Sequence, residues 1–254
     1  MTIFRSSALI AALLLAGGSG QPVAGRVAAM PIPTSVASLR ALPEGEQQAL
    51  AFKAVFGTVE PVAGEHGSET RAAGLIWRGD RAILITTTEI AQGCHYCGGS
   101  LGIYYLAPAG EGFAVTGKYP RATLPGSFGR APIWSVSDAF GPGPTLVARN
   151  GTGGQGYACG SIELTELAAE RPRKLVRVTA DYDGTGDGPR PNPGSYQLKG
   201  EMGAIVPGKS FTMDYTGIRV GTGPQKFSET YVRTATGYAL NGKSKLQPCA
   251  DTIL

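Results

Sequence analysis

The chain has 254 residues and a formal net charge of +4, with 42% hydrophobic and 17% charged residues. A chain of this size and balance can bury a sizeable core, which excludes an intrinsically disordered protein. The positive charge is dispersed, without a run of lysine and arginine, and this argues against a nucleic-acid partner. The 38 glycines and 18 prolines exceed ordinary usage and favour many tight turns over long helices.

The N-terminus has the three-part pattern of a secretory signal peptide. Arg5 supplies the positive charge, residues 8–16 form an apolar stretch, and small residues follow at 17–20. The apolar stretch is much shorter than the roughly 20 residues that cross a membrane as a helix. We therefore expect a signal peptide over residues 1–20 and a soluble periplasmic or secreted protein with no membrane span once the signal is removed.

Four cysteines in an exported chain form an even set that an oxidising compartment normally pairs. Cys94 and Cys97 are close enough in sequence to pair locally, which leaves Cys159 to pair with Cys249. Two other connectivities remain open, but these two disulfides are the expected ones. The second bridge would tie the C-terminal tail back across about 90 residues and restrict the unfolded chain.

The mature chain begins with a segment of small residues and prolines at 21–40, which we expect to be a linker or poorly ordered. A single β-rich domain is expected over 41–254. Near its start, Pro43 suits a first helical turn, and apolar residues recur at helical spacing up to Phe56 before Gly57 ends the run. One short N-terminal helix is therefore predicted.

Beyond this helix the pattern becomes strand-like, with turn residues about every ten positions. We expect about eleven strands, at 74–77, 82–90, 101–106, 112–119, 133–140, 145–148, 157–167, 174–182, 196–201, 211–215 and 227–240. The alternative for the last stretch is a hairpin of 228–234 and 237–240, broken near Ala235. Because no long helical pattern separates them, an antiparallel β-sandwich or open barrel is favoured over a parallel α/β sheet. A division into two domains near 141–144 is the alternative to one continuous β unit.

Two stretches, 203–210 and 237–244, match the phosphate-loop pattern of glycine, four residues and Gly-Lys-Ser. That loop binds phosphate through backbone N–H groups and the start of a following helix. A β-like run at 211–215 follows the first match, and a short tail containing Pro248 follows the second. We therefore expect no nucleotide cofactor.

The sharpest local feature is Cys94-His95-Tyr96-Cys97. Haem attachment requires a histidine after the second cysteine, where this chain has Gly98. A thioredoxin-like site requires a helix after the first cysteine, but 101–106 is strand-like. A zinc site would need further ligands such as Cys159 or Cys249. A structural disulfide is the favoured interpretation, and redox activity stays open.

Asp181, Asp183 and Asp187 lie among glycines and resemble the start of a calcium loop, in which carboxylates alternate along the chain. Counting from Asp183, the twelfth position is Gly194, where the loop requires glutamate. A solvated turn is the favoured interpretation, and these three residues are the chain's calcium candidate.

The catalytic residues cannot be named from the sequence. His95 is confined between cysteines and His66 lies in a glycine-rich stretch, so a serine–histidine mechanism is not favoured. By elimination we expect a structural, ligand-binding or partner-binding role, with the ligand and partners unknown. The alternatives are an extracytoplasmic hydrolase and a thiol–disulfide protein that uses Cys94 and Cys97.

Overall fold

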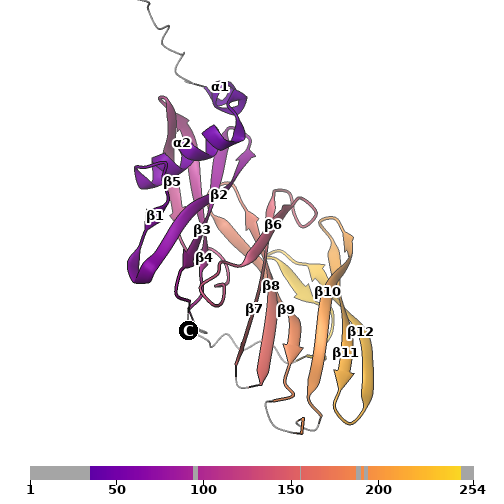
Figure 1. Cartoon of the computed structure of the whole chain (residues 1–254). Helices are drawn as coiled ribbons and strands as arrows, with labels where there is room; N and C mark the ends of the chain where they lie inside the picture. Colours follow the sequence, from indigo (N-terminus) through magenta and orange to yellow (C-terminus); the bar gives the residue numbers. More distant parts are fainter. Residues whose placement is uncertain (1–34, 94–96, 155, 187–189, 192–193, 247–254) are drawn as a thin grey trace, which may run out of the picture. The chain divides into compact units, whose positions relative to one another are not determined.

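The computed structural model describes residues 35–93, 97–154, 156–186, 190–191 and 194–246 (Figure 1). All of them belong to one compact unit, 32–254. The signal-peptide segment and residues 21–34 lie outside the described part. The described chain is mainly β and every paired strand is antiparallel, which confirms the predicted fold class. None of its helices is long and apolar enough to cross a membrane.

The first sheet has five strands in the order of the chain. They are β1 (Val62–Ala63), β2 (Ser68–Arg78), β3 (Arg81–Ile90), β4 (Ser100–Ala109) and β5 (Gly112–Tyr119). A 3-10 turn, η1 (Glu65–Gly67), connects β1 to β2. The predicted strand at 74–77 is thus the last part of a longer strand, because the polar residues before Gly74 also pair with β3.

The second sheet has eight strands, again in sequence order from β6 to β13. They are β6 (Ile133–Ser137), β7 (Thr145–Gly154), β8 (Tyr157–Leu167), β9 (Pro172–Asp183), β10 (Tyr196–Val206), β11 (Ser210–Arg219), β12 (Gly223–Arg233) and β13 (Tyr238–Leu240). The stretch 227–240 forms a hairpin, as the alternative with a break near Ala235 predicts, and the chain turns back where the Thr234 N–H donates to the carbonyl of Gly237. Residues 141–144 join β6 to β7 and therefore lie within one sheet.

Two helices precede the sheets (Figure 1). The predicted helix is α2 (Glu44–Phe56), which ends where Gly57 adopts a left-handed conformation with φ 79°. The preceding helix α1 (Val36–Ala41) was not predicted. Ser35 caps it by accepting a hydrogen bond from the Ser38 N–H at 3.2 Å, which is a local start signal that the sequence analysis overlooked.

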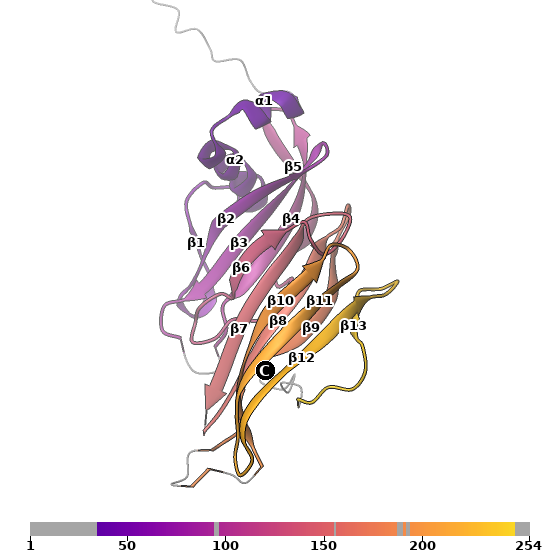
Figure 2. The ribbon, with the colours of Figure 1, turned by 90° about the vertical axis from the view of Figure 1, so that its right-hand side faces the viewer.

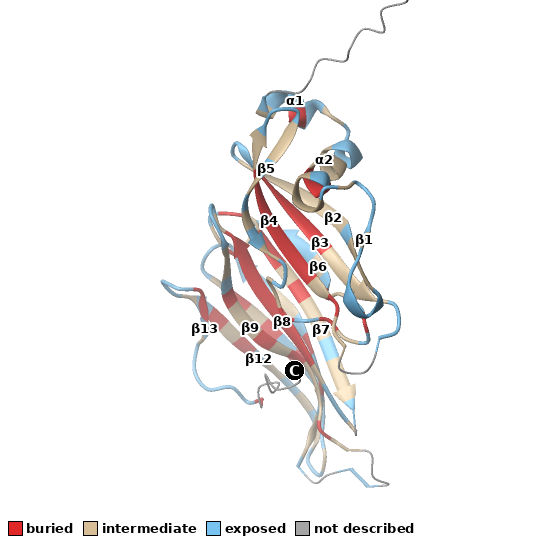
Figure 3. Cartoon of the chain, turned by 90° about the vertical axis from the view of Figure 1, so that its left-hand side faces the viewer, coloured by how far each residue is buried: buried red, intermediate tan, exposed pale blue. Residues whose placement is uncertain are grey.

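The core is built in layers (Figure 3). On one face of the first sheet, Phe52 of α2 packs with Leu84 and Tyr104. The opposite face packs on β7 and β8, where Leu146 and Leu167 meet the isoleucines of β3 and β4. Trp77 belongs to the helix layer and Trp134 to the layer between the sheets.

The remaining strands of the second sheet bend around a further core (Figure 2). Phe140, from the loop between β6 and β7, lies edge-on to Phe211, and Phe211 stacks on Tyr231 at a centroid distance of 5.0 Å. Such aromatic pairs add stability beyond the apolar area they bury. The sandwich-like arrangement follows from the contact of the first sheet with β7 and β8.

Candidate functional site

A pocket of about 810 Å³ lies where the first residues of β2, the last residues of β3 and the loop before β6 come together. Five of its side chains carry charge or an aromatic ring: Glu69, Arg71, Glu89, Phe128 and Arg130. Small residues of the β1–β2 turn and of the segment after β3 form the rest of the wall. Pockets of this size accommodate small ligands.

The charged side chains form two ion pairs. Glu69 and Glu89 stand directly opposite each other in the β2–β3 ladder, an arrangement in which like charges repel. Arg71 pairs with Glu69, and Nη1 of Arg130 lies 3.2 Å from a carboxylate oxygen of Glu89. The four side chains are 43–78% exposed, so solvent screens both pairs and they contribute little to stability.

Two non-glycine residues adopt a left-handed backbone among the described residues, and both flank this pocket. Phe128, with φ 51°, lines it and is 47% exposed. His66, with φ 55°, directly precedes Gly67, which also lines it. Non-glycine residues rarely adopt this conformation, and such strain concentrates at functional sites. Backbone geometry therefore singles out this pocket, a signal that the sequence could not show.

Glycines hold the wall of the pocket by close backbone contact. A Cβ atom on Gly93 would lie 2.3 Å from the carbonyl oxygen of Phe128, and one on Gly126 would lie 1.7 Å from that of Arg130. The Ile90 N–H donates to the Gly129 carbonyl at 2.8 Å, and the Gly129 N–H donates to the Cys97 carbonyl at 2.6 Å. The segment that carries Cys97 is thereby fixed behind the pocket.

The structure describes two of the four predicted disulfide cysteines. Cys97 and Cys159 are both described, and neither is a free thiol. Cys94 and Cys249 lie outside the described residues, as does His95, so the pairing stays a prediction. Residues 98–99, which are not helical, follow Cys97 and lead into β4 at Ser100.

Two of the three calcium candidates are engaged in other contacts. Asp181 forms an ion pair with Arg149 at 2.8 Å. Asp183 accepts hydrogen bonds from the Thr185 N–H and hydroxyl and from Gln197. Burial acts to raise the pKa of Asp183, but these hydrogen bonds outweigh it and the pKa is lowered. Among the described residues no three potential metal ligands cluster. Asp187 lies outside them, so this site stays a prediction.

Sequence analysis missed three buried carboxylates, Glu163, Glu166 and Glu229. Glu163 accepts a hydrogen bond from the Leu124 N–H at 3.0 Å. Glu229 accepts from the Ser244 hydroxyl and the Lys245 N–H, each at 2.8 Å, and so fixes the segment that follows β13. Periodicity could not reveal that these acids are buried, because their partners come from the pairing of strands and from loops and not from a fixed spacing along the chain.

Within the described residues, neither phosphate-loop match is followed by a helix. The first, 203–210, crosses the turn between β10 and β11, and strand β11 follows. The second, 237–244, covers β13 and the segment after it, which is held on Glu229. The first stretch therefore lacks the strand–loop–helix geometry that directs N–H groups at a phosphate, and the described part of the second shows no helix either.

Comparison of the chain with models of known protein families, with curated proteins and with solved structures finds no match.

Proposed function

We propose that the protein is an exported binding protein, and that the pocket at the ends of β2 and β3 holds a small polar ligand carrying both charge signs. The observation that carries this proposal is the convergence of two Glu–Arg pairs and both left-handed non-glycine residues on one pocket of about 810 Å³. The export and the periplasmic or extracellular location rest on the signal-peptide pattern at residues 1–20.

The charge arrangement defines the ligand class. Arg71 and Arg130 offer planar guanidinium groups that suit a carboxylate, and Glu69 and Glu89 offer acceptors for an ammonium group. The exposed ring of Phe128 adds an apolar surface at the rim. A zwitterionic peptide matches this combination because it presents both charges on a short polar backbone.

The two alternative functions have less support. A glycosidase-type acid needs a carboxyl group in apolar surroundings. Glu69 and Glu89 instead are 43% and 45% exposed and each lies beside an arginine. A thiol–disulfide site favours a cysteine at the start of a helix, whereas Cys97 leads into a strand.

The test is an NMR titration of the signal-cleaved protein with triglycine. We expect amide shifts confined to 68–71, 87–93 and 127–130, and we expect Glu89→Gln and Arg130→Gln to remove most of them. Glu201→Gln, which removes one acid from the exposed pair with Lys199 on the second sheet, is the matched control and leaves them unchanged. Absence of shifts with triglycine, or shifts with the neutral sugar maltose alone, would refute the zwitterion assignment.

A further inference from the structure

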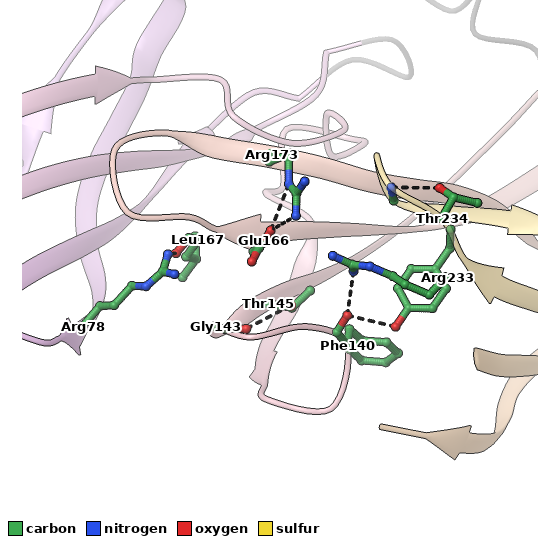
Figure 4. Close-up of polar contacts among 11 residues, drawn as sticks. Arg78, Phe140, Gly143, Thr145, Glu166, Leu167, Arg173, Arg233 and Thr234 are labelled. Atoms are coloured by element: carbon green, nitrogen blue, oxygen red, sulfur yellow. Dashed lines mark hydrogen bonds and ion pairs between the residues drawn. The ribbon is translucent and has the colours of Figure 1, made fainter. Parts of the chain in front are cut away.

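Three arginines surround the loop at residues 141–144, Gly-Pro-Gly-Pro, which we name the Gly-Pro loop (Figure 4). Arg78 ends β2, at the opposite end of that strand from the pocket, while Arg173 lies on β9 and Arg233 ends β12. Arg78 and Arg233 approach the loop directly, and Arg173 is joined to it through the carboxylate of Glu166.

Two of these arginines donate to neutral acceptors. Arg233 donates to the Phe140 carbonyl at 2.8 Å, and Arg78 donates to the Leu167 carbonyl. Among the described residues neither has a carboxylate within ion-pair distance. A carbonyl orients a guanidinium group but does not neutralise it, so both positive charges persist.

The third arginine is neutralised. Glu166, 2% exposed, accepts hydrogen bonds from Nε and Nη2 of Arg173 through a single carboxylate oxygen, Oε2. The three arginines and this glutamate together carry a formal charge of +2. An excess of two positive charges on fixed, partly buried guanidinium groups is an arrangement that proteins use to hold phosphate and carboxylate.

Glycine makes this approach possible. An ideal Cβ on Gly143 would lie 3.0 Å from Cζ of Arg78, and one on Gly141 would lie 3.7 Å from Nη1 of Arg233. A side chain at position 143 would crowd the Arg78 guanidinium, whereas one at position 141 would be in ordinary contact with Arg233 and with Oε1 of Glu166, 3.6 Å away. The loop therefore presents its backbone directly to the arginines.

The loop also has backbone donors without acceptors. Pro142 and Pro144 have no N–H, so Gly141 and Gly143 supply the only two N–H groups of the loop. Neither N–H reaches an acceptor in the described part of the chain, although Gly143 is buried. Backbone N–H groups of a folded chain nearly always have an acceptor, so these two donors are available to an acceptor that binds at the loop.

A second donor in the same region is unsatisfied. The Tyr105 hydroxyl is buried and has no hydrogen-bond partner among the described residues. Tyr105 belongs to the same core cluster as Leu146 and Leu167, and the Leu167 N–H donates to the carbonyl of Pro144 in the loop at 2.8 Å. Arginine charges, backbone N–H groups and a hydroxyl are all donors, so their common missing partner is an acceptor with negative charge.

We propose that the Gly-Pro loop and Arg78, Arg173 and Arg233 form an oxyanion site that binds a phosphate group. A phosphate dianion matches the formal excess of +2, and its oxygens accept from guanidinium forks and backbone N–H groups. The group is supplied by free inorganic phosphate or by a phosphate monoester. This site is separate from the proposed peptide pocket and does not depend on it.

Calorimetric titration of the signal-cleaved protein with inorganic phosphate, in a buffer free of other oxyanions, tests the proposal. A parallel titration with glycerol 3-phosphate distinguishes the two sources, since a monoester site binds it at least as tightly. We expect Arg78→Gln and Arg233→Gln each to weaken phosphate binding roughly tenfold or more. Lys53→Gln, which removes an equal charge from the exposed face of α2, leaves binding unchanged.

Two further variants distinguish a loss of phosphate binding from a loss of the fold. Gly143→Ala retains every charge but moves the Arg78 guanidinium, and Arg78→Lys retains the charge but loses the planar fork. Both are expected to bind phosphate more weakly while thermal unfolding shows a folded protein. The proposal is overturned if the unmodified protein does not bind phosphate. It is also overturned if Lys53→Gln weakens phosphate binding as much as the arginine variants do, because the net charge of the protein would then explain the binding.

Discussion

The carboxylate of Glu163 accepts a hydrogen bond from the backbone N–H of Leu124, a residue 39 positions earlier in the chain. The same carboxylate lies 3.4 Å from the Lys174 ammonium group, and Glu163 itself is 3% exposed. A buried acid on β8 thus fixes the loop between β5 and β6, the connection between the two sheets.

Removing this acceptor should destabilise the protein. Glu163→Ala leaves the buried N–H of Leu124 without a partner, and we expect a loss of about 2–3 kcal/mol in the free energy of unfolding. Glu163→Gln keeps an acceptor and should lose less. Urea denaturation followed by circular dichroism measures both, with the exposed Glu201→Ala as a control that should show no measurable change. Equal stability of Glu163→Ala and the unmodified protein would contradict the structural role.

The glycine contacts behind the pocket should not tolerate a methyl group. Gly126→Ala places Cβ 1.7 Å from the Arg130 carbonyl oxygen, so the loop must move, at a cost of about 3 kcal/mol. Gly45→Ala is the matched control, because nothing lies within 4 Å of its Cβ position and α2 should gain roughly 0.5–1 kcal/mol. Thermal unfolding compares the two variants. Similar melting temperatures would show that the loop is not held as described.

Alkaline pH should unfold the protein through its buried tyrosines. Burial is the main cause that raises the pKa of Tyr215 and of Tyr231, and the nearby Glu229 carboxylate raises both further. A pKa raised by folding means that the unfolded state loses its protons first. The contribution of these two tyrosines to the free energy of unfolding is therefore fully present below a pH of about 10, the ordinary tyrosine pKa. It declines as the pH rises above that value.

This expectation can be measured by urea denaturation at a series of pH values from neutral to strongly alkaline. Tyr231→Phe removes one ionisable group, so the decline above pH of about 10 should become shallower. Tyr215→Phe should act in the same direction, although it also removes the hydrogen bond to the Thr179 carbonyl at 2.6 Å. A decline of unchanged steepness in both variants would assign the alkaline unfolding to other groups.

The disulfide pairing can be read directly by mass spectrometry of non-reduced peptides from the exported protein. We expect Cys94 linked to Cys97 and Cys159 linked to Cys249, both resisting reduction across a glutathione titration. The same peptide map locates the mature N-terminus near residue 21. Ready reduction of the Cys94–Cys97 bridge alone would instead favour the thiol–disulfide function.

Features encoded locally were predictable from the sequence. The helix ending at Gly57 and most strands were found, because glycine termination and hydrophobic alternation are short-range signals. The helix α1 was missed because it is six residues long and its apolar pattern is brief. The start of β2 was missed because Ser68 to Arg71 are mostly polar and pair with β3 through the backbone.

The pocket could not be predicted because it depends on register and on backbone angles. Glu69 and Glu89 become neighbours only when β2 and β3 pair as they do. The left-handed conformation of Phe128 has no signature in its side chain, since glycine and asparagine are the usual residues there. Arg130 reaches Glu89 across 41 positions of sequence.

The chain has two tryptophans, and the fold places them in different layers. The Trp77 indole N–H donates to Gln47 of α2 at 2.8 Å, and the Arg40 guanidinium lies 4.7 Å from the ring centroid. Trp134 instead reaches from β6 to Gly74 of the first sheet. Each indole is thus a separate optical reporter: fluorescence from a Trp134→Phe variant follows release of the helices, and fluorescence from a Trp77→Phe variant follows separation of the sheets.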